Sequence, residues 1–236
     1  MSEPILALED VHTHIGQHHI LQGVTLAFTA GRATVLLGRN GAGKSTTLRT
    51  IMGLNPASSG KILLQGRPIH RMKPYDIARS GIGFVPEDQA VLYTLTVEEN
   101  FRLAMVPEND SSWQRMDTVF ALFPDMKKFW RTKAGLLSGG QKQMLAIARA
   151  FVNDHKLLLI DEPSKGLAPI VVDQVAESLN HIKEHTTVVL VEQNFAMAGH
   201  VGSDYFILDD GHVVHQGLMG DLAEDEELKK TYLGIA

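Results

Sequence analysis

Short apolar runs recur along the chain, each bounded by glycine, proline or polar residues. The runs Thr34–Leu37, Leu157–Ile160 and Thr186–Val191 show no alternation of apolar and polar positions, which is typical of strands buried on both faces. Further strands are expected at residues 5–11, 22–28, 61–65, 82–85, 204–208 and 212–215. The first two of these predict an antiparallel pair leading into the strand at 34–37, and Asp209-Asp210-Gly211 predicts a hairpin between the last two.

Between these expected strands, apolar residues recur at the spacing of a helix. Helices are expected at residues 46–52, 97–105, 113–123, 138–152, 170–184 and 221–232, with Thr96, Ser111-Ser112 and Ser138 as N-terminal caps. Strands that alternate with helices predict an α/β fold with a mainly parallel sheet covered on both faces. Residues 87–152 contain only helical patterns, so we expect a helical insert within a frame formed by residues 1–86 and 153–236.

Composition narrows the class of protein. The chain has 236 residues, which suits one large domain, and a net charge of −5, which argues against a nucleic-acid binder. No apolar run approaches the roughly 18 residues of a membrane span, and the first residues lack the layout of a secretory signal. The chain contains no cysteine, which excludes disulfides and thiolate metal sites and suits a reducing cytoplasm.

Four histidines lie close together near the N-terminus, at positions 12, 14, 18 and 19. Histidine is a common metal ligand, but we find no neighbouring carboxylate or cysteine that completes a ligand set. We therefore interpret these histidines as residues of a hairpin loop.

One motif follows the strand at 34–37 and begins the next helix. The segment Gly38–Thr46 fits G-x-x-x-x-G-K-[ST], the loop that binds a nucleotide triphosphate. Its glycines let backbone N–H groups approach phosphate oxygens, and the free N–H groups of the helix add donors and positive charge. Lys44 can bridge the β- and γ-phosphates, and the Ser45 hydroxyl can bind Mg²⁺. The residues assigned to nucleotide binding are Gly38, Arg39, Asn40, Gly41, Ala42, Gly43, Lys44, Ser45 and Thr46.

Two carboxylates follow the buried run 157–160. A strand that ends in Asp161 can deliver this carboxylate to the phosphate end of the loop, where it would bind Mg²⁺ directly or through water. Glu162 can polarise the attacking water as a general base. An acidic strand end can also cap a neighbouring helix, but the phosphate loop in the same sheet favours the catalytic interpretation.

A second glycine-rich helix start occurs at Leu137-Ser138-Gly139-Gly140-Gln141. The glycines leave backbone amides uncovered and the Ser138 hydroxyl adds a donor, so the segment can bind an anion. Since one loop suffices for the chain's own nucleotide, this segment points to a γ-phosphate presented by another subunit. A capped helix with a glycine-rich turn is the simpler alternative.

Taken together, these motifs resemble the ATP-binding subunit of ABC transporters over essentially the whole chain. The resemblance implies a RecA-like P-loop core with an antiparallel β-subdomain and a helical subdomain that carries the signature sequence at residues 137–141. It implies a head-to-tail dimer in which ATP lies between the Gly38–Thr46 loop of one subunit and Ser138, Gly139, Gly140 and Gln141 of the other. It also implies that Pro86–Asp88 transmits the nucleotide state to transmembrane permease subunits.

A narrower resemblance rests on further segments. Val85–Glu87, Leu95–Asn100, Gly166–Pro169, Val191–Asn194 and Tyr232–Gly234 are similar to one of the two ATPase subunits of branched-chain amino-acid importers. Related importers for urea and short amides carry similar patterns. The resemblance implies a second ATP-binding subunit, an indirect link to a periplasmic or extracellular solute-binding protein, and a place on the inner face of the cell membrane.

Four positions depart from the general ABC pattern. Glu87 replaces a glutamine and could bind Mg²⁺, Gln193 replaces a histidine that contacts the γ-phosphate, and Ala168 replaces an aspartate. Gln193 can donate a hydrogen bond but cannot accept a proton. These changes leave open a second interpretation, a nucleotide-gated partner that hydrolyses ATP poorly. Ile15 replaces the aromatic residue that stacks on adenine, so we expect weak discrimination between bases.

Overall fold

The computed structural model describes residues 4–105 and 110–235. A six-stranded sheet forms its centre, in the order β10-β9-β3-β8-β7-β6, and all neighbours pair in parallel except β9 with β10. The strands are β3 (Ala33–Leu37), β6 (Ile82–Val85), β7 (Leu157–Asp161), β8 (Thr187–Val191), β9 (Asp204–Asp209) and β10 (His212–Leu218). The predicted parallel sheet is therefore confirmed.

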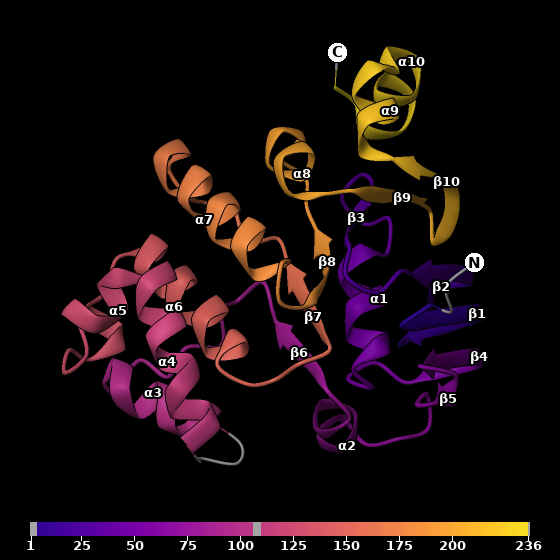
Figure 1. Ribbon diagram of the computed structural model, residues 1–236. Helices are drawn as coiled ribbons and strands as arrows, with labels where there is room; N and C mark the ends of the chain where they lie inside the picture. The colour runs from indigo at the N-terminus through magenta and orange to yellow at the C-terminus, as the bar shows by residue number, and fades with distance from the viewer. Residues whose placement is uncertain (1–3, 106–109, 236) are drawn as a thin grey trace.

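Burial on both faces explains why the central strands lack polar alternation. Every residue of β3, β7 and β8 is buried. Val35 packs in a hydrophobic cluster with α7 (Pro169–Ile182) and α8 (Phe195–Val201), while the adjacent Leu36 packs in a second cluster with α1 (Lys44–Ile51). Successive side chains of a strand point to opposite faces, so the sheet is covered by helices on each side (Figure 1).

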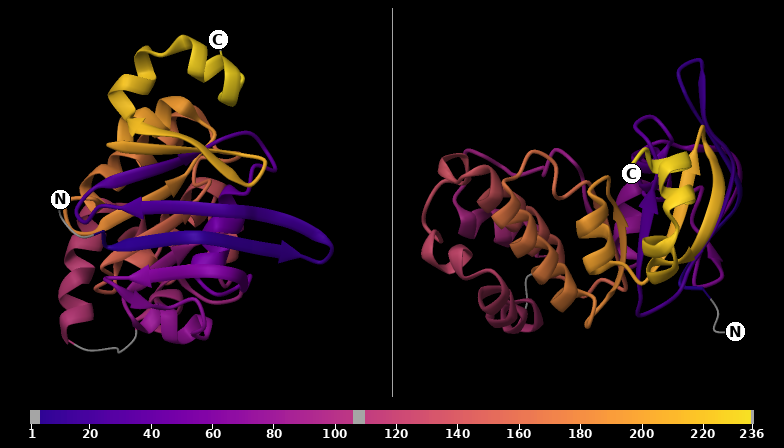
Figure 2. Two further views of the ribbon diagram at one scale, coloured as in Figure 1. Left: turned by 90° about the vertical axis from the view of Figure 1, so that its right-hand side faces the viewer. Right: turned by 90° about the horizontal axis from the view of Figure 1, so that it is seen from above.

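A second, antiparallel sheet lies beyond α1 in the order β2-β1-β4-β5. Its strands are β1 (Leu6–Ile15), β2 (His18–Phe28), β4 (Ala57–Leu64) and β5 (Arg67–Pro68). The long β1–β2 hairpin extends past the body of the molecule (Figure 2). The predicted antiparallel pair is present and leads along the chain into β3, and β1 also pairs with β4 in this second sheet.

The four histidines near the N-terminus do not lie in a hairpin loop, contrary to the expectation from the sequence. They lie in β1 and β2, and only Gly16 and Gln17 remain between these strands. His12 Nδ1 lies 3.0 Å from His19 Nε2, and the rings of His14 and His19 stack at 4.2 Å. A carboxylate oxygen of Asp10 lies 3.3 Å from His12 Nε2, so a nearby acid exists. In residues 4–105 and 110–235, however, no group of three or more such side chains could hold a metal ion.

The connection between β6 and β7 forms a separate helical lobe (Figure 1). It contains α3 (Val97–Ala104), α4 (Asp110–Leu122), α5 (Pro124–Lys128), a 3₁₀ turn (Ala134–Leu136) and α6 (Gly139–Phe151). Thr96 caps α3 as predicted, since its hydroxyl accepts from Glu99 N at 3.2 Å. The predicted cap at residues 111–112 is wrong because α4 already begins at Asp110.

The C-terminal segment is not the continuous helix expected from residues 221–232. It consists of α9 (Met219–Glu224), α10 (Glu226–Leu228) and a π-helical turn at Lys229–Leu233. Asp225 separates the first two because its backbone is non-helical, with φ −93° and ψ 87°, and its side chain caps the next turn through Leu228 N. Periodicity did not predict α2 (Pro74–Arg79), α5 or α8, which are short.

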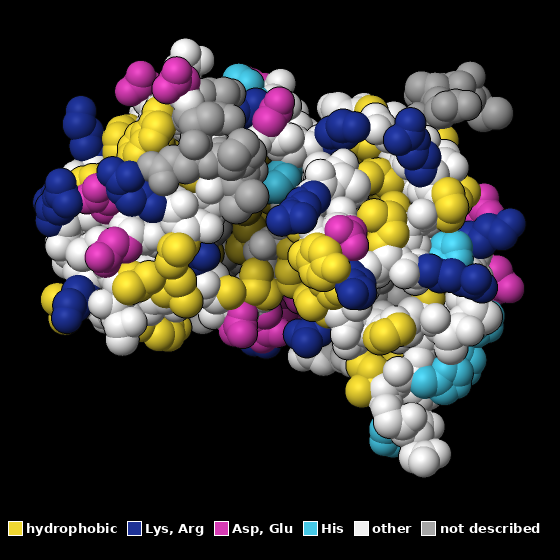
Figure 3. Space-filling view, turned by 90° about the horizontal axis from the view of Figure 1, so that it is seen from below, with side chains coloured by type: hydrophobic (Ala, Val, Ile, Leu, Met, Phe, Trp, Pro, Cys, Tyr) yellow, Lys and Arg dark blue, Asp and Glu magenta, His cyan; other side chains and the backbone are white. Residues whose placement is uncertain are grey.

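A groove of about 500 Å³ separates the helical lobe from the sheets. Figure 3 shows this face hollowed between the two lobes, with hydrophobic side chains at the floor of the hollow. Residues of α2, β6 and α6 contribute most of its lining, among them Tyr75, Arg79, Phe84, Ala146 and Arg149. In the part of the chain that the structure describes, no helix combines the length and the apolar character needed to cross a membrane.

Candidate nucleotide-binding and catalytic site

Neighbouring parallel strands bring the predicted site residues together at one edge of the sheet. β3 leads into the Gly38–Thr46 loop, and β8 leads into Gln193. β7 ends at Asp161 and is followed by Glu162, and β6 leads into Glu87. Since the carboxyl ends of parallel strands meet at the same edge, segments more than 100 residues apart along the chain converge there.

Close backbone contacts explain two glycines of the phosphate loop. A Cβ on Gly38 would lie 2.1 Å from the carbonyl oxygen of Leu208, which no real structure tolerates. Gly43 has φ +101°, a left-handed conformation, and a Cβ there would lie 2.9 Å from a methyl group of Leu21. The loop can therefore adopt this shape only with glycine at both positions.

The Lys44 side chain lies inside the loop, and the residue is 4% exposed. Its Nζ donates to the carbonyl oxygens of Gly38 at 2.9 Å and Arg39 at 3.0 Å. Burial lowers the pKa of Lys44, and the nearby carboxylates of Glu162 and Asp161 act in the opposite direction. The cation is thus held inside the curve of the loop, where the phosphates of a nucleotide would bind.

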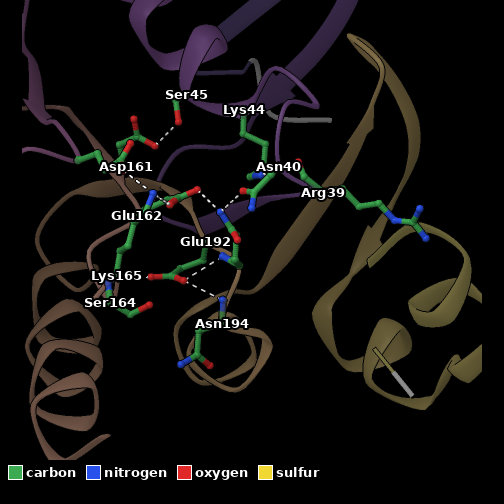
Figure 4. Close-up of polar contacts among 12 residues, drawn as sticks. Arg39, Asn40, Lys44, Ser45, Asp161, Glu162, Ser164, Lys165, Glu192 and Asn194 are labelled. Carbon is green, nitrogen blue, oxygen red and sulfur yellow. Dashed lines mark hydrogen bonds and ion pairs between the residues drawn. The ribbon is translucent and has the colours of Figure 1, made fainter. Parts of the chain in front are cut away.

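A hydrogen bond between Ser45 and Asp161 joins the phosphate loop to β7. The Ser45 hydroxyl donates to Asp161 Oδ1 at 2.8 Å (Figure 4). Burial raises the pKa of Asp161 to about 6, and the nearby Glu162 and Glu87 also raise it, while the bond from Ser45 lowers it. A buried carboxylate beside a hydroxyl is a set of hard oxygen donors, which fits Mg²⁺ when nucleotide phosphates and water supply the remaining ligands.

An amide connects the predicted general base to the phosphate loop. Gln193 Nε2 donates to Glu162 Oε1 and to Asn40 Oδ1, both at 2.6 Å. Glu162 has φ +45°, a left-handed conformation that is uncommon outside glycine, and it is 9% exposed. Strained backbone of this kind is concentrated at functional sites. The arrangement holds a carboxylate beside the loop with its orientation set by Gln193.

Lys165 is a site residue that the sequence did not reveal. Its Nζ lies 2.6 Å from Glu87 Oε1 and 3.3 Å from Glu162 Oε2, and these contacts raise its pKa. The ion pairs connect the segment after β6 to the turn after β7. The only signal in the sequence is a cation three residues after Glu162, which is too common a pattern to single out.

The sequence assigns Arg39 and Ile15 to nucleotide binding, but the Arg39 side chain points away from the site and Ile15 is exposed. The Arg39 guanidinium points away from Lys44 (Figure 4) and donates to the carbonyl oxygen of Thr231 in the C-terminal π-helical turn at 3.0 Å. Only the backbone of Arg39 therefore faces Lys44. Ile15 lies at the end of β1 and is 46% exposed.

The glycine-rich start of α6 lies in the helical lobe, whereas the phosphate loop lies in the sheet frame (Figure 1). Ser138 and Gln141 form a reciprocal cap, since Gln141 N donates to Ser138 Oγ at 3.2 Å and Ser138 N donates to Gln141 Oε1 at 3.0 Å. A Cβ on Gly140 would lie 2.6 Å from a methyl group of Val171 in α7, whereas one on Gly139 would meet nothing within 4 Å. Packing against α7 thus accounts for Gly140, and Gly139 leaves its backbone uncovered.

Comparison with known proteins gives consistent results. A branched-chain amino-acid transport ATP-binding protein, BraG of Pseudomonas aeruginosa, is 38% identical over 98% of this chain and 100% of its own. A probable branched-chain amino-acid transport ATP-binding protein, LivF of Archaeoglobus fulgidus, is 35% identical over 92% of this chain and 93% of its own.

A solved dimeric ATP-binding cassette in a post-hydrolysis state, bound to ADP and Pi, has a similar fold. It superposes with a TM-score of 0.80 at 25% identity, over 91% of this chain and 98% of its own. The family profile described as ABC transporter matches residues 21–165. This segment contains the phosphate loop, the glycine-rich start of α6 and the two carboxylates at the end of β7. The chain therefore belongs to the ABC transporter family, as an ATP-binding cassette with the P-loop α/β fold.

Proposed function

We propose that the protein is the Mg²⁺-dependent ATP-hydrolysing subunit of an ABC importer for branched-chain or other hydrophobic amino acids. The convergence of Lys44, Asp161, Glu162 and Gln193 at one sheet edge is the observation that carries the ATPase part. The two relatives named for branched-chain amino-acid transport support the solute class.

The residues of this chain divide the work of hydrolysis. N–H groups of the loop and the Lys44 ammonium hold the phosphates and balance their charge. Ser45 and Asp161 would hold Mg²⁺, which supplies charge stabilisation to the transferring phosphoryl group. Glu162 accepts a proton from the attacking water, and the Gln193 amide keeps the carboxylate oriented beside the loop. Glu87 could add an acidic ligand once released from Lys165.

The nucleotide site is completed by a second ATP-binding subunit. Residues 87–152 act as a helical subdomain that presents Ser138, Gly139, Gly140 and Gln141 to the γ-phosphate of the partner. The uncovered backbone of Gly139 and the separation of the α6 start from the phosphate loop support this role. The dimeric form of the similar cassette supports the same arrangement.

Transmembrane permease subunits dock at the groove between the two lobes, next to Pro86–Asp88. The groove is large enough for side chains of a partner segment and combines apolar walls with Arg79 and Arg149. This docking places the protein peripherally on the cytoplasmic face of the cell membrane. The solute-binding protein, periplasmic or extracellular, acts on this chain only through the permease.

A second candidate is a nucleotide-gated subunit that hydrolyses ATP poorly beside a more active partner. The ion pair between Lys165 and Glu162 favours it, because Lys165 Nζ occupies Glu162 Oε2, an oxygen of the carboxylate that would act as the general base. Single-turnover hydrolysis in a heterodimer with one disabled site separates the two candidates.

Glu162→Gln tests the first proposal. We expect turnover to fall below detection while ATP binding persists and the dimer becomes stable in ATP, measured by light scattering. Unchanged turnover would remove Glu162 as the base. Uptake of leucine into vesicles that contain the reconstituted importer, compared with uptake of urea and a short amide, tests the solute class.

A further inference from the structure

A third glutamate at the site, besides Glu162 and Glu87, has no role in the scheme above. Glu192 directly follows β8, next to Gln193, and is 1% exposed. A buried carboxylate is costly unless hydrogen bonds compensate for lost hydration. Burial also raises the pKa of Glu192, which shows that the environment disfavours the charge. Burial of this carboxylate therefore lowers the stability of the fold, and its hydrogen bonds indicate which role it has.

Both oxygens of Glu192 accept peptide N–H groups from two different loops (Figure 4). Oε1 accepts from Ser164 N at 3.0 Å, and Oε2 accepts from Gln193 N and Asn194 N, each at 2.9 Å. Bonds of N–H groups to a carboxylate are stronger than those between neutral partners. One buried side chain thus joins the turn after β7 to the loop after β8.

These two loops carry the catalytic groups. Ser164 lies two residues after Glu162, in the same turn, and Gln193 is the residue that donates to Glu162. Glu192 and Gln193 therefore close a ring between the loops, one through backbone N–H groups and the other through the amide–carboxylate bond. Such a ring fixes the distance between Gln193 and Glu162 without touching a nucleotide.

Capping of helix α8, or pairing of a buried charge with a cation, explains the contacts of Glu192 less well. The helix α8 already has its own cap, because Asn194 Oδ1 accepts from Met197 N at 3.1 Å. Glu98, a carboxylate with 8% exposure in the helical lobe, is balanced by two guanidinium groups, those of Arg102 and Arg131. Glu192 instead binds peptide groups on both sides of the catalytic pair.

We propose that Glu192 is a positioning residue for ATP hydrolysis, which holds Gln193 against Glu162 by fixing the backbones of both loops. The proposal rests on the roles given above to Glu162 and Gln193. It predicts an effect on the chemical step and little effect on nucleotide binding, because the phosphate loop keeps its own contacts.

Glu192→Gln tests the proposal with little change in shape. The new NH₂ group faces peptide N–H groups and leaves them unpaired, so the two loops separate. We expect kcat for ATP to fall 10- to 100-fold while KM stays within about threefold. The matched control is Glu98→Gln, which removes the charge of another buried carboxylate and should leave kcat within twofold. Equal kcat in wild type and Glu192→Gln would overturn the proposal.

A double-mutant cycle separates positioning from a general structural effect. If Glu192 acts through Gln193, Glu192→Gln should lower kcat less than threefold in a Gln193→Ala background. Full additivity of the two losses would overturn the proposal. If Glu192→Gln does not fold, Glu192→Asp serves instead, since it keeps the charge but is too short for both loops. Its kcat should fall at least fivefold, and an unchanged kcat would again overturn the proposal.

The same measurements distinguish failure of this inference from failure of the proposed function. Wild-type protein without Mg²⁺-dependent hydrolysis would contradict the proposed function. Normal hydrolysis in wild type together with an unaffected Glu192→Gln variant would contradict only the positioning role.

Discussion

Asp161 is expected to destabilise the nucleotide-free protein at neutral pH. Burial and two nearby carboxylates raise its pKa from 3.8 to about 6, even though Ser45 donates to it. A raised pKa means that the folded state binds the proton more tightly than the unfolded chain, so stability is lost as pH rises from about 4 to 6. At about 1.4 kcal/mol per unit, the cost reaches about 3 kcal/mol at pH 7 and about half of that at pH 5.

Asp161→Asn removes this cost while keeping an oxygen that can accept from Ser45. We expect the variant to be about 1–3 kcal/mol more stable than wild type at pH 7.5, which corresponds to a rise in Tm of about 2–10 °C for a chain of this size. The advantage should shrink by about 1 kcal/mol at pH 5, where the wild-type carboxyl is largely protonated.

Thermal unfolding in EDTA at the two pH values measures this difference. Asp173→Asn, an exposed site on α7, is the control and should change stability by less than about 0.5 kcal/mol. With Mg²⁺ and ATP the order should reverse, because only wild type gains the stabilisation of the bound metal and nucleotide. The reasoning would be refuted if Asp161→Asn were less stable than wild type at pH 7.5, or if its stability advantage over wild type were as large at pH 5 as at pH 7.5.

Three further predictions concern single residues. Ile15→Tyr should tighten ATP binding about fivefold, since a stacked aromatic contributes about 1 kcal/mol, whereas wild type should bind ATP and GTP with similar affinity in titration calorimetry. A strong preference for ATP in wild type that the variant leaves unchanged would contradict this. Gly140→Ala should cost about 1–3 kcal/mol in urea unfolding because its Cβ would lie 2.6 Å from Val171, and Val171→Ala should restore most of the loss. Arg39→Ala should speed proteolysis at the C-terminal turn, because the carbonyl oxygen of Thr231 loses its hydrogen-bond donor. ATPase activity should stay within threefold of wild type. Unchanged proteolysis would show that this hydrogen bond does not anchor the turn.

Local chemistry made part of the site readable from the sequence. A phosphate loop needs glycines at fixed spacing, a lysine and a hydroxyl, so Gly38–Ser45 could be recognised without any knowledge of tertiary contacts. The same holds for the buried runs that became β3, β7 and β8, because strands covered on both faces must be apolar at every position. The cap at Ser138 also depends only on residues three positions apart.

Expectations about where elements begin and end failed where polar residues decided the outcome. The β1–β2 hairpin is longer than its hydrophobic pattern because its two strands pair with each other over polar positions as far as Ile15 and His18, beyond the last pairing of β1 with β4 at Thr13. The C-terminal helix breaks at Asp225, whose side chain caps the next turn instead of continuing the previous one. Neither effect produces apolar periodicity, which is the signal that sequence analysis uses.

By itself, the sequence determined the phosphate-loop motif and the buried central strands, because both are recognised from residues close together in the chain. Only the tertiary structure decided which polar groups meet. Lys165 pairs with Glu87 across 78 residues of chain and also with the nearby Glu162, and Glu192 accepts from Ser164 N across 28 residues and also from the adjacent Gln193 N. These pairings exist because β6, β7 and β8 are adjacent and parallel, so their carboxyl ends, however far apart in the chain, lie at one edge of the sheet.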